Sequence, residues 1–147
     1  MFIVNVEAAI YKDEKWLIVR RSEKEEHAAG ALALVGGKVD DEGNSSDILE
    51  RTLIREVEEE VGVTVSNLMY VNSSSFVTDS SVAVVDIVFL CSYQEGKPFA
   101  KDPEEVASVS WMSTQEILNH AEIPSFLKVN IQLAENLVKS NTTSFVV

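Results

Sequence analysis

Residue types that mark secreted, membrane and nucleic-acid-binding proteins are scarce in this sequence. It has a single cysteine, Cys91, so no disulfide can form within the chain, which is typical of a reducing cytoplasm. Basic residues number 12 against 24 acidic ones, which gives a formal net charge of −12 at pH 7. A surface with this charge repels phosphate backbones and anionic lipids. The composition therefore disfavours nucleic acids and membranes as partners, and a phosphorylated substrate would need a cation to approach.

Long apolar segments are also absent. The N-terminal stretch MFIVNVEAAIYKDEK has no basic start followed by a long apolar core, so it does not predict a signal peptide. No apolar run approaches the roughly 20 residues that a transmembrane helix needs. Cys91 lies inside the apolar run VAVVDIVFLC and is expected to be a buried core residue rather than a reactive thiol. We therefore predict a cytoplasmic protein.

A length of 147 residues and a hydrophobic fraction of 46% fit one globular domain. We expect this domain to span 1–140, with 141–147 as a C-terminal tail. Strands are predicted at 2–11, 16–22, 35–39, 63–77 (with a loop at its serines), 81–93 and 106–113. Helices are predicted at 47–61, 114–120 and 125–139, the first capped by Ser46 and stopped by Gly62. Strands around one central helix, with helices at the end, predict an α+β fold of the α/β/α sandwich type.

The helix predicted at 47–61 carries the stretch IREVEEEVGV, which has an unusual density of glutamates. On a wheel of about 100° per residue, the core-facing stripe consists of Leu49, Leu53, Ile54, Val57 and Val61. Glu58 lies opposite this stripe, as a solvated residue should. Glu56 and Glu60 instead project inside the stripe or at its edge, and Glu59 lies beside them. A simple solvated surface does not account for these three positions.

Glu56, Glu59 and Glu60 share one side of the helix, at i, i+3 and i+4, where like charges repel. Partial burial destabilises the folded state by several kcal/mol for each unpaired ion. Arg51 and Arg55 are too few to neutralise the acids of this helix. A hard divalent cation with oxygen ligands would resolve the conflict. Mg²⁺, or Mn²⁺ as a substitute, suits a few carboxylates completed by water and substrate phosphate. The alternative is an acidic helix that serves solubility alone.

Gly36 and Gly37, followed by REVEEEVGV at 55–63, resemble the Nudix box of the Nudix hydrolase superfamily in its MutT-like form. The helical half of the motif matches at Arg55, Glu56, Val57, Glu59, Glu60, Gly62 and Val63. The stretch DDEGNSSD adds a four-residue insertion between the two halves, which a loop absorbs easily. The resemblance implies a Nudix-type α/β/α sandwich with a mixed β-sheet and a central catalytic helix.

The same resemblance assigns roles to individual residues. The divalent-metal ligands that it implies are Glu56, Glu59, Glu60 and the carbonyl of Gly36 or Gly37. Arg55 would pair with an acid and fix its orientation. The base that deprotonates the attacking water varies in the superfamily, and the candidates here are Glu59 and either Glu104 or Glu105 of the DPEE loop. The plain alternative for the DPEE pair is a solvated loop.

Substrate contacts follow from the stretch RRSEKEEHAAGALALVGGK, which resembles the arginine–histidine loop of MutT-like members. Arg21 would then contact a phosphate through its guanidinium, and His27 would contact the substrate. Both residues also fit a solvated loop. Trp111 and Phe76 are expected to fill the core rather than to stack on a base.

Three functions remain open from the sequence. The resemblance implies a Mg²⁺-dependent pyrophosphohydrolase that cleaves a nucleoside diphosphate linked to another group, with a (d)NTP or an oxidised nucleotide as the leading substrate. A non-catalytic Nudix domain that senses a nucleotide or an ADP-ribose-like ligand is the alternative, although such domains tend to lose helix glutamates that this chain retains. An acidic interaction protein without metal is the third. The expected partner is a small nucleotide, and the chain is expected to be a monomer or a homodimer.

Overall fold

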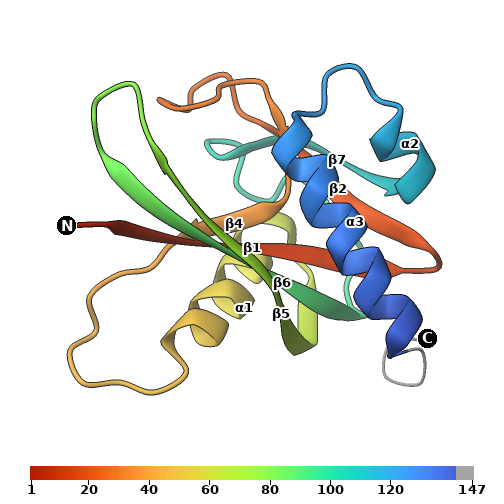
Figure 1. Cartoon of the computed structure of the whole chain (residues 1–147), viewed down its shortest axis with the longest axis horizontal. Helices are drawn as coiled ribbons and strands as arrows, with labels where there is room; N and C mark the ends of the chain where they lie inside the picture. Colours follow the sequence, from red (N-terminus) through yellow and green to blue (C-terminus); the bar gives the residue numbers. More distant parts are fainter. Residues whose placement is uncertain (142–147) are drawn as a thin grey trace.

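The computed structural model describes residues 1–141 (Figure 1). All of the predicted tail except Asn141 lies outside the described residues. The strands are β1 (Ile3–Lys12), β2 (Lys15–Arg21), β3 (Leu32–Ala33), β4 (Val35–Lys38), β5 (Thr64–Val77), β6 (Ala83–Glu95) and β7 (Val106–Ser113). The helices are α1 (Ile48–Val61), α2 (Thr114–Leu118) and α3 (Ser125–Ser140).

The strands form one mixed sheet in the order β3-β2-β1-β6-β5, with β4 paired to β1 and β7 paired to β2. The long β1–β6 pairing is parallel, and the other pairings are antiparallel. Because β6 occupies one edge of β1, both β2 and β4 must share the other edge. β4 pairs with residues 5–8 of β1, whereas β2 pairs with residues 11–12. The sheet therefore forks at β1, and this fork creates the space for a site.

Helices cover both faces of the sheet, as Figure 1 shows. One core lies between the sheet and α1, where Leu53, Val57 and Val61 pack on Val6 and Ala8 of β1. A second core lies on the opposite face, where α2 and α3 contribute Ile117, Leu127, Ile131, Ala134 and Val138. The α/β/α sandwich is thus confirmed. No helix within the described part of the chain has the length and apolarity required to cross a bilayer.

The hairpin of β1 and β2 matches its prediction. Its two turn residues, Asp13 and Glu14, both have positive φ (49° and 63°), which suits a tight turn between twisted strands. The loop expected at the serines of β5 is wrong, because that strand continues through them. Ser73, Ser74 and Ser75 each pair with a residue of β6, and bulges earlier in β5 absorb the irregular pattern.

Helix α1 ends as predicted but begins differently. Gly62 has a φ of 72° and terminates the helix, since glycine adopts this left-handed conformation at no steric cost. Ser46 is not the N-cap. Asp47 holds that position with a φ of 54° and no side-chain capping bond, and the Ser46 carbonyl instead accepts from Nε of Arg51. Ile54 is 37% exposed, so its assignment to the core stripe is wrong. It lies at the edge of an arc centred on the other apolar residues of the helix.

Candidate functional site

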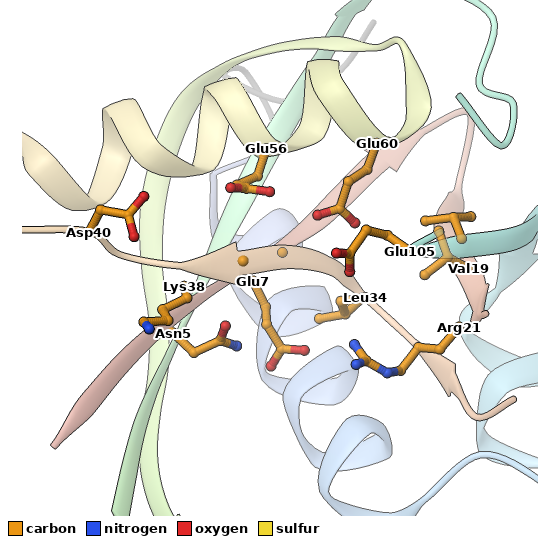
Figure 2. A pocket seen from close by; sticks show the side chains of 13 residues that line it. Asn5, Glu7, Val19, Arg21, Leu34, Lys38, Asp40, Glu56, Glu60 and Glu105 are labelled. Carbon is orange, nitrogen blue, oxygen red and sulfur yellow. The ribbon is translucent and has the colours of Figure 1, made fainter. Parts of the chain in front are cut away.

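A cleft of about 350 Å³ opens where β2 and β4 diverge from β1. Its walls come from β1, β2, β4, α1 and the loop before β7. Figure 2 shows that the side chains lie on both sides of β4, with those of α1 on one side and those of β1 on the other. Charged and amide groups dominate the lining: Asn5, Glu7, Arg21, Lys38, Asp40, Glu56, Glu60 and Glu105. A cleft of this polarity suits a charged ligand.

The two glycines of β4 allow its neighbours to approach closely on both faces. A Cβ on Gly37 would lie 2.5 Å from Cδ of Glu56, and a Cβ on Gly36 would overlap the carbonyl oxygen of Val6. Any side chain at these positions would therefore displace either the carboxylate of α1 or the backbone of β1. The paired glycines are a requirement of packing around the cleft, independently of any ligand.

Two glutamates of α1 enter the cleft from the helix side. The Glu60 residue is only 8% exposed, and the Glu56 side chain is 19% exposed. Burial, a hydrogen bond to Glu56 and the nearby negative charges raise the pKa of Glu60 to about 9. Arg55 pairs with Glu56, with 3.6 Å between Nη2 and Oε1, and so restrains its orientation. Glu59 is exposed to solvent and does not line the cleft.

The loop between β6 and β7 brings Glu105 beside these helix residues. The backbone N–H groups of Lys101 and Asp102 donate to the Glu60 carbonyl, at 3.0 and 3.3 Å, so the end of α1 fixes the loop. A side-chain hydrogen bond with Glu25, followed by burial, raises the pKa of Glu105 to about 7. Glu104, by contrast, forms an exposed ion pair with Lys24 at 3.1 Å. The fold therefore separates the two acids of the DPEE loop and places only Glu105 in the cleft.

Arg21 lines one end of the cleft, close enough to Glu105 and Glu7 to influence both carboxyls. Its guanidinium donates to the His27 carbonyl through Nε (3.2 Å) and Nη2 (3.0 Å), and it pairs with Glu25 at 3.3 Å. Its positive charge lowers the pKa values of both Glu105 and Glu7, which opposes the larger effects that raise them. Arg21 is the strand-end arginine that the sequence singled out, and its side chain lines the cleft.

His27 does not line the cleft, and its ring instead stacks on Phe76. The two ring centroids are 6.1 Å apart and the ring planes differ by 12°. Phe76 is 41% exposed, so the expectation that it fills the core is wrong. It is the last residue but one of β5, next to the turn that leads into β6. Trp111 is partly buried against the core on the α1 side, as expected.

A second pair of carboxyls, Glu7 and Asp86, was not identified from the sequence. Asp86 is 6% exposed, and its Oδ1 accepts a hydrogen bond of 2.7 Å from Asn5 Nδ2. Burial and a hydrogen bond to Asp86 raise the pKa of Glu7 well above its ordinary value. Both acids interrupt apolar strands, in VEAAI and VVDIV. That interruption was the available signal, but it does not reveal that β1 and β6 bring the two residues together.

The donor set on the α1 side fits a hard divalent cation. Glu56 and Glu60 approach closely enough to share a proton, so a cation could replace that proton and remove their repulsion. Within residues 1–141, no three carboxylate, imidazole or thiol side chains are already converged for a metal ion. A third carboxylate would have to come from a side chain that can turn, and exposed Glu59 is such a residue.

Two solved structures illustrate how widely this fold is shared. The MutT NUDIX hydrolase from Burkholderia pseudomallei aligns with a TM-score of 0.77 at 23% identity, covering 90% of this chain and 98% of that chain. The NUDIX domain of Shewanella oneidensis NrtR, complexed with ADP ribose, aligns with a TM-score of 0.73 at 21% identity, covering 93% and 89%. At these identities the likeness shows a shared fold.

Sequence comparison agrees with the fold. A curated relative, the NAD-capped RNA hydrolase NudC of Photobacterium profundum, is 26% identical over 132 residues, which cover 90% of this chain but 46% of the relative. The chain thus spans about half the length of the curated relatives that it matches. The family model described as NUDIX domain matches residues 1–132. That match extends over the whole sheet, the glycine pair and the acidic helix, and this chain therefore belongs to the NUDIX family.

Proposed function

We propose that this chain is a Mg²⁺-dependent hydrolase that cleaves the phosphoric anhydride bond of a nucleoside diphosphate derivative, with a (d)NTP or an oxidised nucleotide as the leading substrate. The observation that carries this proposal is the meeting of Glu56, Glu60 and Glu105 at one cleft that Arg21 also lines. Carboxylates on one side and a guanidinium nearby suit a metal-bound polyphosphate.

The first group of residues would bind the metal ion. Glu56 and Glu60 would hold the cation, and Glu59 would join them by rotation of its exposed side chain. Glycine at positions 36 and 37 leaves a backbone carbonyl as a further ligand. Bound Mg²⁺ would supply the positive charge that neutralises the pyrophosphate and acidifies a water. Mn²⁺ would substitute for it.

The chain's own groups then complete the hydrolysis. Glu105, which lines the cleft, is the first candidate to accept the proton from the water that attacks phosphorus, and Glu59 is the second. The anhydride P–O bond breaks, and the leaving phosphate departs with the bonding electron pair. Arg21 would bind an oxygen of the transferred or leaving phosphate through Nη1, since its Nε and Nη2 already contact His27 and Glu25. Arg55, paired with Glu56, would hold that carboxylate in position.

The test is phosphate or pyrophosphate release from a substrate panel with Mg²⁺. The panel spans dNTPs, 8-oxo-dGTP, ADP-ribose, NAD and nucleotide sugars, and it is repeated with EDTA. Glu56→Gln, Glu60→Gln and Glu105→Gln should each remove most of the activity on the preferred substrate. Glu58→Gln is the matched control, since Glu58 lies on the same helix, is exposed and pairs with Lys101 outside the cleft.

Sensing of a nucleotide without hydrolysis is the second candidate function. It is favoured by one observation, the ADP ribose bound to the NrtR domain of similar fold. Under this alternative, no member of the panel would be turned over, yet one would raise the melting temperature of the protein. Turnover that survives both EDTA and Glu56→Gln would contradict the hydrolase as proposed here.

A further inference from the structure

The loop between β2 and β3 carries an acid, Glu25, to which the proposed chemistry gives no role. Its neighbours Glu23, Lys24 and Glu26 are exposed, whereas the Glu25 side chain is only 17% exposed. One of its oxygens, Oε1, is buried and has no N–H or hydroxyl partner among residues 1–141. Burial of a carboxyl is unfavourable unless nearby groups satisfy it, so the surroundings of Glu25 should explain its place.

A short turn brings Glu25 towards the cleft. The Glu25 N–H donates to the Ser22 carbonyl at 3.2 Å, which closes a turn over residues 22–25. Ser22 is buried, and its own N–H donates to the Glu105 carbonyl at 2.9 Å. The backbone of the turn is therefore joined to the residue whose carboxyl lines the cleft.

The Glu25 carboxyl contacts two groups of the cleft. Its Oε2 lies 3.3 Å from Nη2 of Arg21, and a side-chain hydrogen bond joins it to Glu105. An ionised carboxylate has no donor, so this hydrogen bond requires a proton on one of the two acids. The guanidinium favours the ionised form of Glu25. Glu105 is therefore the donor, and the Glu25 carboxylate is the acceptor.

Glu105 depends on this contact more than Arg21 does. Arg21 also donates twice to the His27 carbonyl, so it keeps an anchor without Glu25. Glu105 is exposed, and within residues 1–141 its carboxyl has no other hydrogen bond or ion pair. A glutamate that nothing restrains samples many rotamers. Loss of Glu25 would therefore free Glu105 while Arg21 stayed in place.

We infer that Glu25 is a positioning residue for the proposed hydrolysis: it holds the Glu105 carboxyl in the cleft, where that group accepts a proton from the attacking water. This inference rests on the proposed function, since Glu25 acts only through Glu105. Once the proton has moved from water to Glu105, the protonated carboxyl donates to Glu25, so the same contact stabilises the group after the transfer. Glu25 itself touches neither the substrate nor the metal.

The first experiment is steady-state kinetics with Mg²⁺ on the nucleotide that wild type hydrolyses fastest. Glu25→Ala should lower kcat about 30-fold, because a displaced base is a poor one. Glu25→Gln should keep kcat within about threefold of wild type, since its amide oxygen can accept from Arg21 and its N–H can donate to Glu105. Glu26→Ala is the matched control, an exposed acid of the same loop, and should leave kcat unchanged.

Binding of inorganic tripolyphosphate in Ca²⁺, measured by calorimetry, separates this role from a general loss of loop structure. Arg21→Ala should weaken the binding, which makes the probe a report on Arg21. Glu25→Ala should bind tripolyphosphate at least as tightly as wild type, because it removes a negative charge beside Arg21 and leaves the contacts with His27. Weaker binding would mean that Glu25 only maintains the loop, and would overturn the inference.

A double variant tests whether Glu25 acts through Glu105. In a Glu105→Gln background, Glu25→Ala should lower kcat by no more than about twofold further. A further loss of about 30-fold, or an unchanged kcat in Glu25→Ala alone, would refute the positioning role. If Glu25→Ala does not fold, Glu25→Asp takes its place. It keeps the charge but withdraws the carboxyl by one methylene, so kcat should fall about tenfold, and full activity would refute the role.

The outcomes also distinguish this inference from the proposed function. Absence of turnover from every member of the substrate panel would refute the hydrolase itself. Turnover that is indifferent to Glu25→Ala would leave the hydrolase standing and refute the positioning role alone.

Discussion

Two carboxylates of α1, Glu56 and Glu60, enter the cleft on one side of β4, and Glu7 of the sheet enters it on the other side with buried Asp86 hydrogen-bonded to it. The first pair occupies successive turns of one helix. Its members have no neutral hydrogen-bond donor between them, and Arg55 reaches Glu56 alone. The second pair comes from two parallel strands and is supported by the amide of Asn5. Both pairs are crowded, but only the second has a built-in neutral partner.

This difference teaches how similar groups serve different ligands. An unsatisfied pair of carboxylates lowers its free energy most by binding a divalent cation. Glu7 and Asp86 are hydrogen-bonded to each other, and Asp86 also accepts from the amide of Asn5. This pair is instead suited to directional hydrogen bonds with a neutral polar group of a ligand. We therefore expect changes on the helix side to affect turnover, and changes on the sheet side to affect which nucleotide is bound.

The largest effect should separate these two roles directly. Glu60→Gln should lower kcat by roughly 10³-fold with Mg²⁺, because it removes a carboxylate that would hold the cation against the reacting phosphate. Glu7→Gln should instead raise KM for the preferred nucleotide about tenfold and change kcat by less than about threefold. Steady-state kinetics on the preferred substrate measure both. Equal losses of kcat in the two variants would mean that the two faces of β4 form one catalytic unit.

The two glycines of β4 also differ in what they contact, since one lies against the sheet backbone and the other against a carboxylate of α1. Gly36→Ala should destabilise the fold by about 1–3 kcal/mol, since its Cβ would meet the Val6 carbonyl of the sheet backbone. Gly37→Ala should change stability less, because the Glu56 side chain it meets can rotate away. Its Mg²⁺-dependent activity should nevertheless fall with the displaced carboxylate. Urea unfolding and activity assays on both variants test this prediction. It would be contradicted if Gly37→Ala were less stable than Gly36→Ala.

The pH dependence of the metal-free protein should reveal the strain on the α1 side. The pKa of Glu60 is raised to about 9 in the folded state, so the folded protein holds a proton that the unfolded chain releases near pH 4.5. Stability is then fully present below pH 4.5 and is lost as pH rises towards 9. The melting temperature in EDTA should be lower at pH 8.5 than at pH 5.5.

Two comparisons sharpen that pH experiment. Glu60→Gln should flatten the dependence, since its amide does not titrate. Mg²⁺ should raise the melting temperature more at pH 8.5 than at pH 5.5, because at the lower pH it must displace protons. A metal-free wild type that is equally stable at both values would show that Glu60 is not strained.

The smallest effect is expected for an acid that lies outside both pairs. Glu104 forms an exposed ion pair with Lys24, adjacent in sequence to Glu105. Glu104→Gln should change the free energy of unfolding by no more than about 0.5 kcal/mol and leave kcat/KM unchanged. Thermal unfolding and the same nucleotide assay measure this. A large loss of activity would mean that Glu104, and not Glu105, is the loop carboxylate that acts in the reaction.

Much of the fold could be predicted because its signals are local. The helix stop at Gly62, the β1–β2 hairpin and the buried Cys91 each follow from a few neighbouring residues. Errors arose where a local pattern was overridden. Three consecutive serines predicted a loop, but their backbone groups pair with β6 and keep the strand intact. Phe76 was expected in the core, yet it lies at the end of β5 and is exposed.

The sequence by itself determined the acidic helix and the glycine pair that precedes it. It also determined that Glu56 and Glu60 lie at the edge of an apolar stripe, because helical geometry fixes the relation between residues three and four apart. Only the tertiary structure decided that Glu105 rather than Glu104 lies in the cleft, and that Asn5 contacts Asp86 across 81 positions. Those relations depend on which strands pair, in what register and where the sheet forks. They are set by the packing of the whole chain, and no short stretch of sequence contains them.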